Sequence, residues 1–288
     1  MYLTSKRMTI NIFHGAGLGL RRSMLSDVAG LQHGAVDFLE VTPENWLQLS
    51  GAFDRKLRAL TERYATVSHG LSLNLGGPAP LDVNHIANLK TFLDRHNIIC
   101  FSEHLSYCAD HGQLYDLMPI PFTDEAVDYV ARRIQQVQDQ LQRRIAIENV
   151  SYYAAPGQQL SEIDFINAVV EQADCDVLLD VNNVYVNSVN HSYSARDFIA
   201  ALPAPRVAYV HIAGHYRESE SLIIDTHGAA VSDPVWTLLD YTYQVMGNKP
   251  TLLERDFNLP PLAELLQEVN TIRCYQPTPE PMYAQRTA

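Results

Sequence analysis

Thr66-Val-Ser-His69, Val207-Ala-Tyr-Val-His211 and Thr251-Leu-Leu-Glu254 are short apolar runs, and each ends on a side chain that can bind a metal. Three further runs end in the same way: Cys100-Phe-Ser-Glu-His104, Ile145-Ala-Ile-Glu148 and Val177-Leu-Leu-Asp180. In chain order the six endings lie 35, 44, 32, 31 and 43 residues apart, about the length of one strand, one helix and two loops. This repetition predicts parallel strands that alternate with helices.

Two earlier segments, Ile10 to His14 and Phe38 to Val41, are also strand candidates, so eight strands are expected. Eight parallel strands alternating with helices are typical of a (β/α)8 TIM barrel, whose strands point their C-terminal ends at one mouth. We therefore predict an α/β fold of this kind, with residues 1–275 as a single domain. The Pro-rich segment 276–288 is expected to be a loosely ordered tail.

Amphipathic segments separate the expected strands. The clearest runs from Thr123 to about Arg144, with Thr123 as the expected N-cap. Ser161 is expected to cap a second helix, and Ser232-Asp233-Pro234 to begin a third that ends near Gly247. Further helices are expected at residues 53–64, 85–96, 195–202 and 262–272.

The composition excludes several classes of protein. The formal net charge is −12 and no run of Lys or Arg interrupts it, so we expect neither nucleic acid nor an anionic membrane as a partner. No segment approaches the roughly 18 to 20 apolar residues of a membrane span, and the start has no apolar signal region. The four cysteines are scattered without a C-x-x-C pair, which indicates reduced thiols and a cytoplasmic location.

Imidazoles and carboxylates that converge on one mouth predict a multinuclear metal centre. Asp225-Thr-His227 adds an Asp-x-His pair, which would point two more ligands to one side of an extended segment. Burying so many charges together would be prohibitive without cations, so we interpret the set as metal ligands. Because no thiolate is among them, the set suits iron, manganese or zinc.

Three groups of ligands are expected. His69, His104 and Glu148 form the first group. Asp180, His211 and Glu254 form the second, with Glu148 as a bridge between the two. The third group is Asp225 and His227, helped by Asn183 from the loop after Asp180.

Other polar residues are not expected to bind the metal directly. His14, Glu40, His215 and Asp256 are expected at most to support the ligands, and the remaining histidines are expected to be solvated: His33, His85, His96, His111 and His191. Residues beside the ligand positions are candidates for substrate binding, with hydrogen bonding inside the mouth as the alternative. They are Glu44, Asn45, Tyr107, Asn149 and Arg255.

A series of stretches carries a family resemblance. In order they are Gly15-Ala-Gly-Leu18, Glu40-Val-Thr-Pro-Glu-Asn-Trp46, Ser68-His-Gly70, Ser102-Glu-His-Leu-Ser106, Ile147-Glu-Asn-Val150, Leu179-Asp-Val-Asn-Asn-Val184, His211-Ile-Ala-Gly-His215, Asp225-Thr-His-Gly228 and Leu253-Glu-Arg-Asp256. The chain resembles the xylose-isomerase-like barrels and, within them, the multinuclear non-haem iron-dependent oxidases, which include the methanobactin biosynthesis oxidase. The resemblance spans nearly the whole chain.

The resemblance implies an iron-dependent oxidoreductase. Members of that family use dioxygen and a mixed-valent iron cluster to oxidise cysteine residues of ribosomally made precursor peptides. Two to three ions, mixed Fe(II)/Fe(III), are thus implied, with catalytic roles for Glu148, Asp180 and His211. The implied ligands are His69, His104, Glu148, Asp180, Asn183, His211, Asp225, His227 and Glu254. A precursor peptide, a role in natural product biosynthesis and a separate protein that binds the peptide's leader are also implied.

Other functions would fit the same barrel. One is a hydrolase resembling endonuclease IV with three zinc ions, although a DNA enzyme should show basic surface that this composition does not supply. Another is a sugar isomerase or epimerase with two divalent ions, which usually needs a Lys near the metals. A non-catalytic metal-binding role is least expected, because open multinuclear sites at barrel mouths are generally catalytic.

Overall fold

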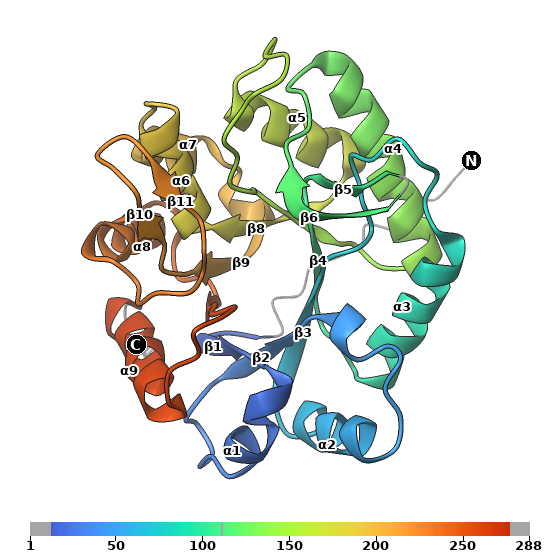
Figure 1. Ribbon diagram of the computed structural model, residues 1–288, viewed down its shortest axis with the longest axis vertical. Coiled ribbons are helices and arrows are strands. Elements are labelled where there is room, and N and C mark those ends of the chain that lie inside the picture. Colours follow the sequence, from blue (N-terminus) through green and yellow to red (C-terminus); the bar gives the residue numbers. More distant parts are fainter. Residues whose placement is uncertain (1–12, 111, 277–288) are drawn as a thin grey trace, which may run out of the picture.

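The computed structural model describes residues 13–110 and 112–276, which build a closed barrel of parallel strands surrounded by helices (Figure 1). Around the barrel the order is β1-β12-β9-β8-β7-β4-β3-β2, and every neighbouring pair is parallel. The predicted TIM barrel is therefore confirmed. Its strands are β1 (Ala16–Gly19), β2 (Phe38–Val41), β3 (Ala65–Gly70), β4 (Phe101–His104), β7 (Ala146–Glu148), β8 (Asp176–Asp180), β9 (Val207–Ile212) and β12 (Thr251–Leu253).

Helices follow the strands and cover the outside of the barrel (Figure 1). Two predicted N-caps are confirmed, because Thr123 Oγ1 accepts from Ala126 N and Ser161 Oγ from Asp164 N, both at 3.2 Å. Sequence reasoning missed α1 and α6. The helices are α1 (Leu25–Ala29), α2 (Ala52–Thr61), α3 (Val83–Arg95), α4 (Asp124–Leu141), α5 (Glu162–Ala173), α6 (Val181–Asn190), α7 (Ala195–Ala201), α8 (Asp233–Met246) and α9 (Leu262–Tyr275), with short 3-10 turns η1 (Arg22–Met24), η2 (Pro43–Asn45) and η3 (Ala204–Arg206).

The first barrel strand does not lie at Ile10 to His14, where the sequence predicted it. Residues 10–12 are outside the described residues, while residues 13 and 14 precede the strand, which begins at Ala16. The glycines of this segment suggest a loop, but one of them is needed inside the barrel. A Cβ on Gly17 would lie 2.5 Å from the Phe38 ring, so the strand is glycine-rich because that ring fills the space beside it.

Two antiparallel hairpins follow strands at the mouth. The first, β5 (Tyr107–Ala109) with β6 (Gln113–Met118), comes after β4, and the second, β10 (Tyr216–Arg217) with β11 (Ile223–Ile224), comes after β9 (Figure 1). Since both connect the C-terminal end of a strand to the next helix, they enlarge the mouth side of the barrel.

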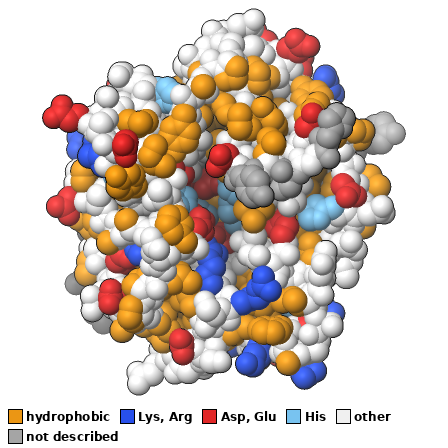
Figure 2. Space-filling view, in the orientation of Figure 1, with side chains coloured by type: hydrophobic (Ala, Val, Ile, Leu, Met, Phe, Trp, Pro, Cys, Tyr) orange, Lys and Arg blue, Asp and Glu red, His pale blue; other side chains and the backbone are white. Residues whose placement is uncertain are grey.

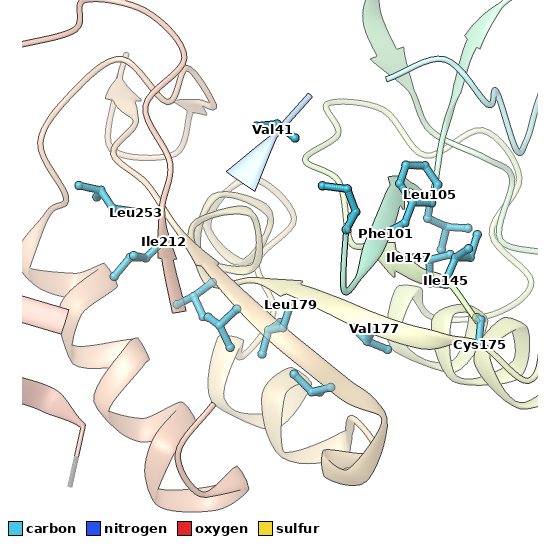
Figure 3. Packing of buried hydrophobic residues seen from close by; sticks show 14 of the residues in the cluster. Val41, Phe101, Leu105, Ile145, Ile147, Cys175, Val177, Leu179, Ile212 and Leu253 are labelled. Carbon is cyan, nitrogen blue, oxygen red and sulfur yellow. The ribbon is translucent and has the colours of Figure 1, made fainter. Parts of the chain in front are cut away.

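Apolar side chains form two separate cores. The outer core lies between strands and helices, and Figure 3 shows some of its strand residues, among them Val41, Leu179 and Ile212. The inner core fills the barrel with Phe13, Phe38, Val67, Ala146, Leu178, Ala208, Tyr209 and Leu252. Successive residues of a strand point to opposite faces. A residue two positions beyond an inner-core residue therefore also faces the interior, one layer nearer the mouth.

The last helix, α9, ends at Tyr275, and residues 277–288 are outside the described residues, so the tail and the domain boundary at 275 stay predictions. Among the described residues, no helix combines the length and apolar character that crossing a bilayer requires.

Candidate metal centre

One layer of polar side chains lies directly above the inner core. Five predicted ligands each stand two residues after an inner-core residue of the same strand segment. The pairs are Val67 and His69, Ala146 and Glu148, Leu178 and Asp180, Tyr209 and His211, and Leu252 and Glu254. His104 ends β4 two residues after Ser102. Figure 2 shows histidine and acidic side chains at the bottom of a hollow in the mouth face. Strand periodicity thus places the predicted ligands together, as the spacing of the runs suggested.

The first predicted group closes around one point. Nε2 of His69 lies 3.1 Å from Oε2 of Glu148, and Nε2 of His104 lies 3.2 Å from the same oxygen. The two imidazole Nε2 atoms are 3.2 Å apart. Adjacent ligands of an octahedral ion with bonds of about 2.1 Å lie about 3.0 Å apart, so this triangle has a suitable size for one cation.

The second group shares Glu148 with the first. His211 Nδ1 is 2.9 Å from Glu254 Oε2 and 3.5 Å from Glu148 Oε1. Asp180 completes a set of four buried side chains whose possible ligand atoms lie within 4.8 Å of one another. Glu148 therefore contacts the histidines of both groups with different oxygens, which is the arrangement expected of a bridging carboxylate.

The third group differs in part from the expectation. His227 Nδ1 is 3.2 Å from Glu254 Oε2 and 3.4 Å from Asp256 Oδ2, so Asp256 joins this group rather than only supporting it. Asp225 Oδ1 is 2.8 Å from the other nitrogen of His227. The prediction of an extended segment from Asp225 to His227 is wrong at His227, whose φ of 47° lies in the left-handed region.

Asn183 does not lie in a loop, as the sequence suggested, but in the first turn of α6. Asp180 caps that helix, and its Oδ1 accepts a hydrogen bond of 2.7 Å from Asn183 N. The cap holds Asp180 and Asn183 beside each other, and the Asn183 side chain lines the cavity at the mouth. A loop would not fix the two side chains in this way.

Some buried atoms form no hydrogen bond of good geometry although other ligand atoms lie close to them, and these atoms test whether the site suits cations. Six of the nine predicted ligand residues carry such an atom: Glu148 Oε2, Asp180 Oδ2, Asn183 Oδ1, His211 Nδ1, His227 Nε2 and Glu254 Oε2. A buried polar atom left without a partner costs about 1–3 kcal/mol. Since these atoms also converge in space, the site fits a set of divalent cations.

The charges of the layer are strongly coupled. Burial alone would lower the pKa of His104, but Glu148 and Glu103 raise it to about 9. Carboxylates also outweigh burial at His211 and His227 and raise the pKa of both. In turn, histidines outweigh burial at Glu148 and Glu254 and hold the pKa of each well below its usual range.

Asp180 behaves differently, because burial raises its pKa well above the usual value although His227 opposes this. Neighbouring histidines thus offset burial at Glu148 and Glu254, whereas at Asp180 burial prevails over the attraction of His227. A divalent cation would supply further positive charge beside Asp180.

A cavity of about 360 Å³ opens above the layer, and Asn45 is the substrate-binding candidate that lines it. Tyr107 lines a different cavity, beside Pro78 and Tyr129. Arg255 is buried and pairs with Glu268 of α9 at 2.7 Å. Asn149 is also buried, and its amide exchanges two hydrogen bonds with the Asp180 backbone.

Glu44, the remaining candidate beside the ligand positions, is not among the residues that line this cavity; it accepts a hydrogen bond from Leu71 N. The alternative interpretation therefore holds for three of these positions, whose side chains form hydrogen bonds or ion pairs with other parts of the barrel: Glu44, Asn149 and Arg255.

The supporting residues are partly as expected. Glu40 is buried and lies 3.0 Å from His211 Nε2, and His215 lies 2.8 Å from Asn182, which donates to Asp225. His14 is exposed and precedes β1, so it lies at the end of the barrel opposite the mouth.

The histidines that were predicted to be solvated differ in their exposure. His33 is exposed as predicted, but the prediction of a solvated His96 is wrong, since this residue is buried against Phe92. His85 and His191 are half-buried, and His191 lies on the Tyr152 ring. His111 is outside the described residues.

Sequence reasoning missed several residues that contact predicted ligands. Ser102 contacts His69, and Ser151 donates to Asp225 Oδ2 at 2.9 Å. Tyr209 lies on the same strand face as His211 and donates to Glu40. Strand periodicity could have identified Ser102 and Tyr209, which stand two residues before His104 and His211, whereas no local signal marks Ser151.

Fold and site together define a xylose-isomerase-like TIM barrel with a metal-capable mouth. Solved structures with the same fold include a xylose isomerase domain protein from Planctomyces limnophilus (TM-score 0.61, 11% identity, covering 90% of this chain and 96% of that one). Endonuclease IV from Thermus thermophilus is similar to the same degree (TM-score 0.61, 15% identity, 91% and 98%). At such low identity these likenesses concern the fold alone.

The chain belongs to the family described as RiPP precursor modification enzyme MbnB/TglH/ChrH, whose model matches residues 15–277. Among curated relatives, a UPF0276 protein of Shewanella loihica is 59% identical over 260 residues, covering 90% of this chain and 94% of that protein. A UPF0276 protein of Pseudomonas aeruginosa is 56% identical over 259 residues, covering 90% and 91%. The chain is therefore an enzyme of a family that modifies precursor peptides.

Proposed function

We propose that the protein is a multinuclear iron-dependent oxidase that uses dioxygen to modify cysteine residues of a ribosomally synthesised precursor peptide. The observation that carries the proposal is the overlap of three metal-capable groups, in which Glu148 belongs to two and Glu254 to two. Shared carboxylates bring neighbouring cations close together, as a reaction between two bound partners requires. Two to three iron ions are proposed, with zinc or manganese as alternatives.

The proposed ligands are the nine residues named from the sequence, and Asp256 is added to them because it lies beside His227. We propose catalytic roles for Glu148, Asp180 and His211, since all three belong to the middle group, which shares one carboxylate with each of the other two groups. Iron held there would supply redox chemistry with dioxygen. The chain itself holds the carboxylates and imidazoles in a layer in which Asp180 and His211 are fully buried.

The proposed substrate supplies what the ligand set lacks. Histidine and carboxylate leave the site without a thiolate, and a peptide cysteine would bring one to iron. Dioxygen is the oxidant and the cysteine-containing peptide is the reductant. Each dioxygen that is reduced fully to two waters takes four electrons and four protons from the peptide.

The surface around the mouth supports a peptide ligand. Large apolar side chains are exposed on loops and hairpins that follow the strands: Leu71, Leu114, Met118, Tyr153, Tyr216, Leu222 and Phe257. Figure 2 shows apolar side chains on several sides of the hollow. Apolar side chains around a polar hollow are typical of a surface that binds another molecule. The described residues are accounted for by the barrel and its hairpins, so we also propose a separate protein that binds the peptide's leader.

Metal analysis and turnover test this function together. Protein purified without oxygen and loaded with iron should contain about two to three ions per chain, because nine or more ligands exceed what one octahedral ion uses. Mixed with a cysteine-containing precursor peptide and its partner, it should consume dioxygen and change the peptide's mass at the cysteine. A peptide with serine in place of that cysteine should remain unchanged.

Two results would reject the proposal. Uptake of no more than one iron per chain would contradict a multinuclear centre. Peptide turnover that is equal without oxygen, or equal with zinc in place of iron, would favour the hydrolase alternative.

A further inference from the structure

A continuous chain of hydrogen bonds crosses the barrel beneath the proposed metal layer. His69 Nδ1 lies 2.7 Å from Ser102 Oγ, which lies 2.6 Å from the Tyr209 hydroxyl. That hydroxyl donates to Glu40 Oε2 at 2.7 Å, and His211 Nε2 lies 3.0 Å from the same oxygen. The five side chains come from β3, β4, β9 and β2, and each is at most 4% exposed.

The protons of this chain can be assigned from the number that each group carries. Tyr209 has one hydroxyl proton and gives it to Glu40, so Ser102 must donate at the contact between the two hydroxyls. Ser102 then has no proton left for His69, and His69 must donate through Nδ1. The other acceptor near Ser102, Ser68 O, is 3.5 Å away and competes poorly.

His69 and His211, at the two ends of the hydrogen-bond chain, therefore offer different ring nitrogens to a metal ion. When a cation takes one nitrogen of each histidine, a single ring proton remains on each. The Glu40 carboxylate only accepts, so His211 keeps that proton on Nε2, and its Nδ1 faces the cation beside Glu254, 2.9 Å away. His69 carries its proton on Nδ1, and its Nε2 points at His104 and Glu148. His69 belongs to the first metal-capable group and His211 to the second.

We propose that Tyr209 is a positioning residue that fixes the tautomers of two metal-binding histidines at once. It does so through Ser102 for His69 and by sharing the Glu40 carboxylate with His211. A cation in the first group then meets Nε2 of His69, and one in the second meets Nδ1 of His211. The inference rests on the metal centre of the proposed function, but not on the oxidation that the proposed function assigns to it.

The Tyr209 hydroxyl is not needed for packing. Its ring lies in the inner core, 5.8 Å from the Phe13 ring, where phenylalanine would fill the same space. A hydroxyl in an apolar layer costs free energy unless it is hydrogen bonded, so its bonds to Ser102 and Glu40 are what the side chain adds. Without that hydroxyl, Ser102 is free to donate to His69 Nδ1, and the His69 lone pair then no longer needs to face Glu148.

Tyr243 provides a matched control. Its ring is buried, and its hydroxyl lies 2.6 Å from Thr251 Oγ1, at the start of β12 and away from the mouth. Both Tyr209→Phe and Tyr243→Phe remove one buried, hydrogen-bonded hydroxyl. Of the two hydroxyls, it is that of Tyr209 that connects to the proposed ligands.

The experiment uses zinc alone as a diamagnetic probe of the full chain. In the wild type, nitrogen NMR of the histidine rings should show a protonated Nδ1 on His69 and a protonated Nε2 on His211. Tyr209→Phe should mix the tautomers of His69. It should also weaken the zinc site that contains His69 by about 10- to 100-fold in a chelator competition, since residues that orient a metal-binding histidine have effects of this size. Tyr243→Phe should bind zinc as the wild type does.

Wild-type zinc affinity and an unchanged His69 tautomer in Tyr209→Phe would overturn the inference while leaving the proposed function intact. If Tyr209→Phe does not fold, Ser102→Ala decides, because it cuts the same chain beside His69: lost affinity supports the inference and unchanged affinity overturns it. Zinc bound with the expected tautomers, in a protein whose iron form does not oxidise peptide, would remove only the proposed function. A wild type that binds less than one zinc would overturn both.

Discussion

The two layers inside the barrel have opposite character although they are built on the same strands. The lower layer is the apolar inner core, in which Phe38, Leu178 and Leu252 are fully buried. The layer above it holds Glu148, Asp180, His211 and their neighbours, equally buried but with several unpartnered atoms. Two residues along a strand separate one layer from the other.

The lower layer stabilises the fold, whereas the upper layer lowers its stability in the absence of balancing charge. Each fully buried Leu, Val or Phe side chain of the lower layer contributes about 1.5–3 kcal/mol. The upper layer brings carboxylates and imidazoles out of water, which opposes folding unless cations or protons balance the charge. Substitutions in the two layers should therefore have different consequences.

The largest effect is expected from the upper layer. Glu148→Ala removes the carboxylate that two groups share, so iron content should fall to about one ion or fewer per chain and peptide oxidation should fall by about 100-fold or more. Elemental analysis and oxygen uptake measure this. Glu171→Ala, at an exposed position on α5, is the control and should change neither quantity. Equal iron content in the two variants would show that the ligand assignment is wrong.

In the lower layer the effect should fall on stability. Leu178→Ala opens a cavity in the inner core and should lower the free energy of unfolding by about 2–5 kcal/mol, as measured by denaturant titration. The folded fraction should still bind the same number of iron ions, because Leu178 packs within the inner core, one layer below the proposed ligands. Loss of iron from a well-folded Leu178→Ala protein would mean that the layers are not separable.

The buried carboxyl group of Glu162 lies outside both layers and provides a contrast with them. Glu162 accepts hydrogen bonds of 3.2 Å from Tyr152 and Asn187, and burial raises its pKa to about 7. The folded chain thus keeps a proton that the unfolded chain loses above its ordinary pKa of 4.5. The stability that this proton contributes is fully present below that pH and falls by about 3 kcal/mol as the pH rises through the folded-state pKa.

Comparison with Glu162→Gln isolates this dependence. The difference in unfolding free energy between the two proteins should shift against the wild type as the pH rises from below the unfolded-state pKa to above the folded-state pKa, while iron content stays equal. A difference that is constant with pH would show that Glu162 is ionised in the folded chain.

The smallest effect is expected at the edge of the upper layer. Ser151→Ala removes one donor to Asp225, but Asn182 still donates to the other oxygen at 3.0 Å. Affinity for the third ion should weaken by about fivefold, near 1 kcal/mol. Ser188→Ala on α6 removes a comparable hydroxyl, bonded to Tyr185 O at 2.7 Å, and should have no effect. Equal affinities would mean that Ser151 does not hold Asp225.

Much of the barrel could be predicted because its strands are short buried runs, which sequence patterns mark well. β2 begins and ends where it was expected, whereas β1 begins at Ala16, beyond the predicted segment from Ile10 to His14. Its glycines can be understood only with the Phe38 ring beside Gly17. The helix at Val181 was missed because Asp180 was interpreted as a ligand and not also as a cap.

The sequence alone determined the barrel, the alternation of strand and helix, and which side chains face the mouth, because these depend on periods of two and of about 3.6 along the chain. Tertiary structure decided the contacts between strands that are far apart in sequence. Glu40 and His211 are separated by 171 positions yet lie 3.0 Å apart. It also directed Arg255 to Glu268 instead of to the cavity and buried His96. Closure of the barrel and packing of its helices set these distances, and no local pattern records them.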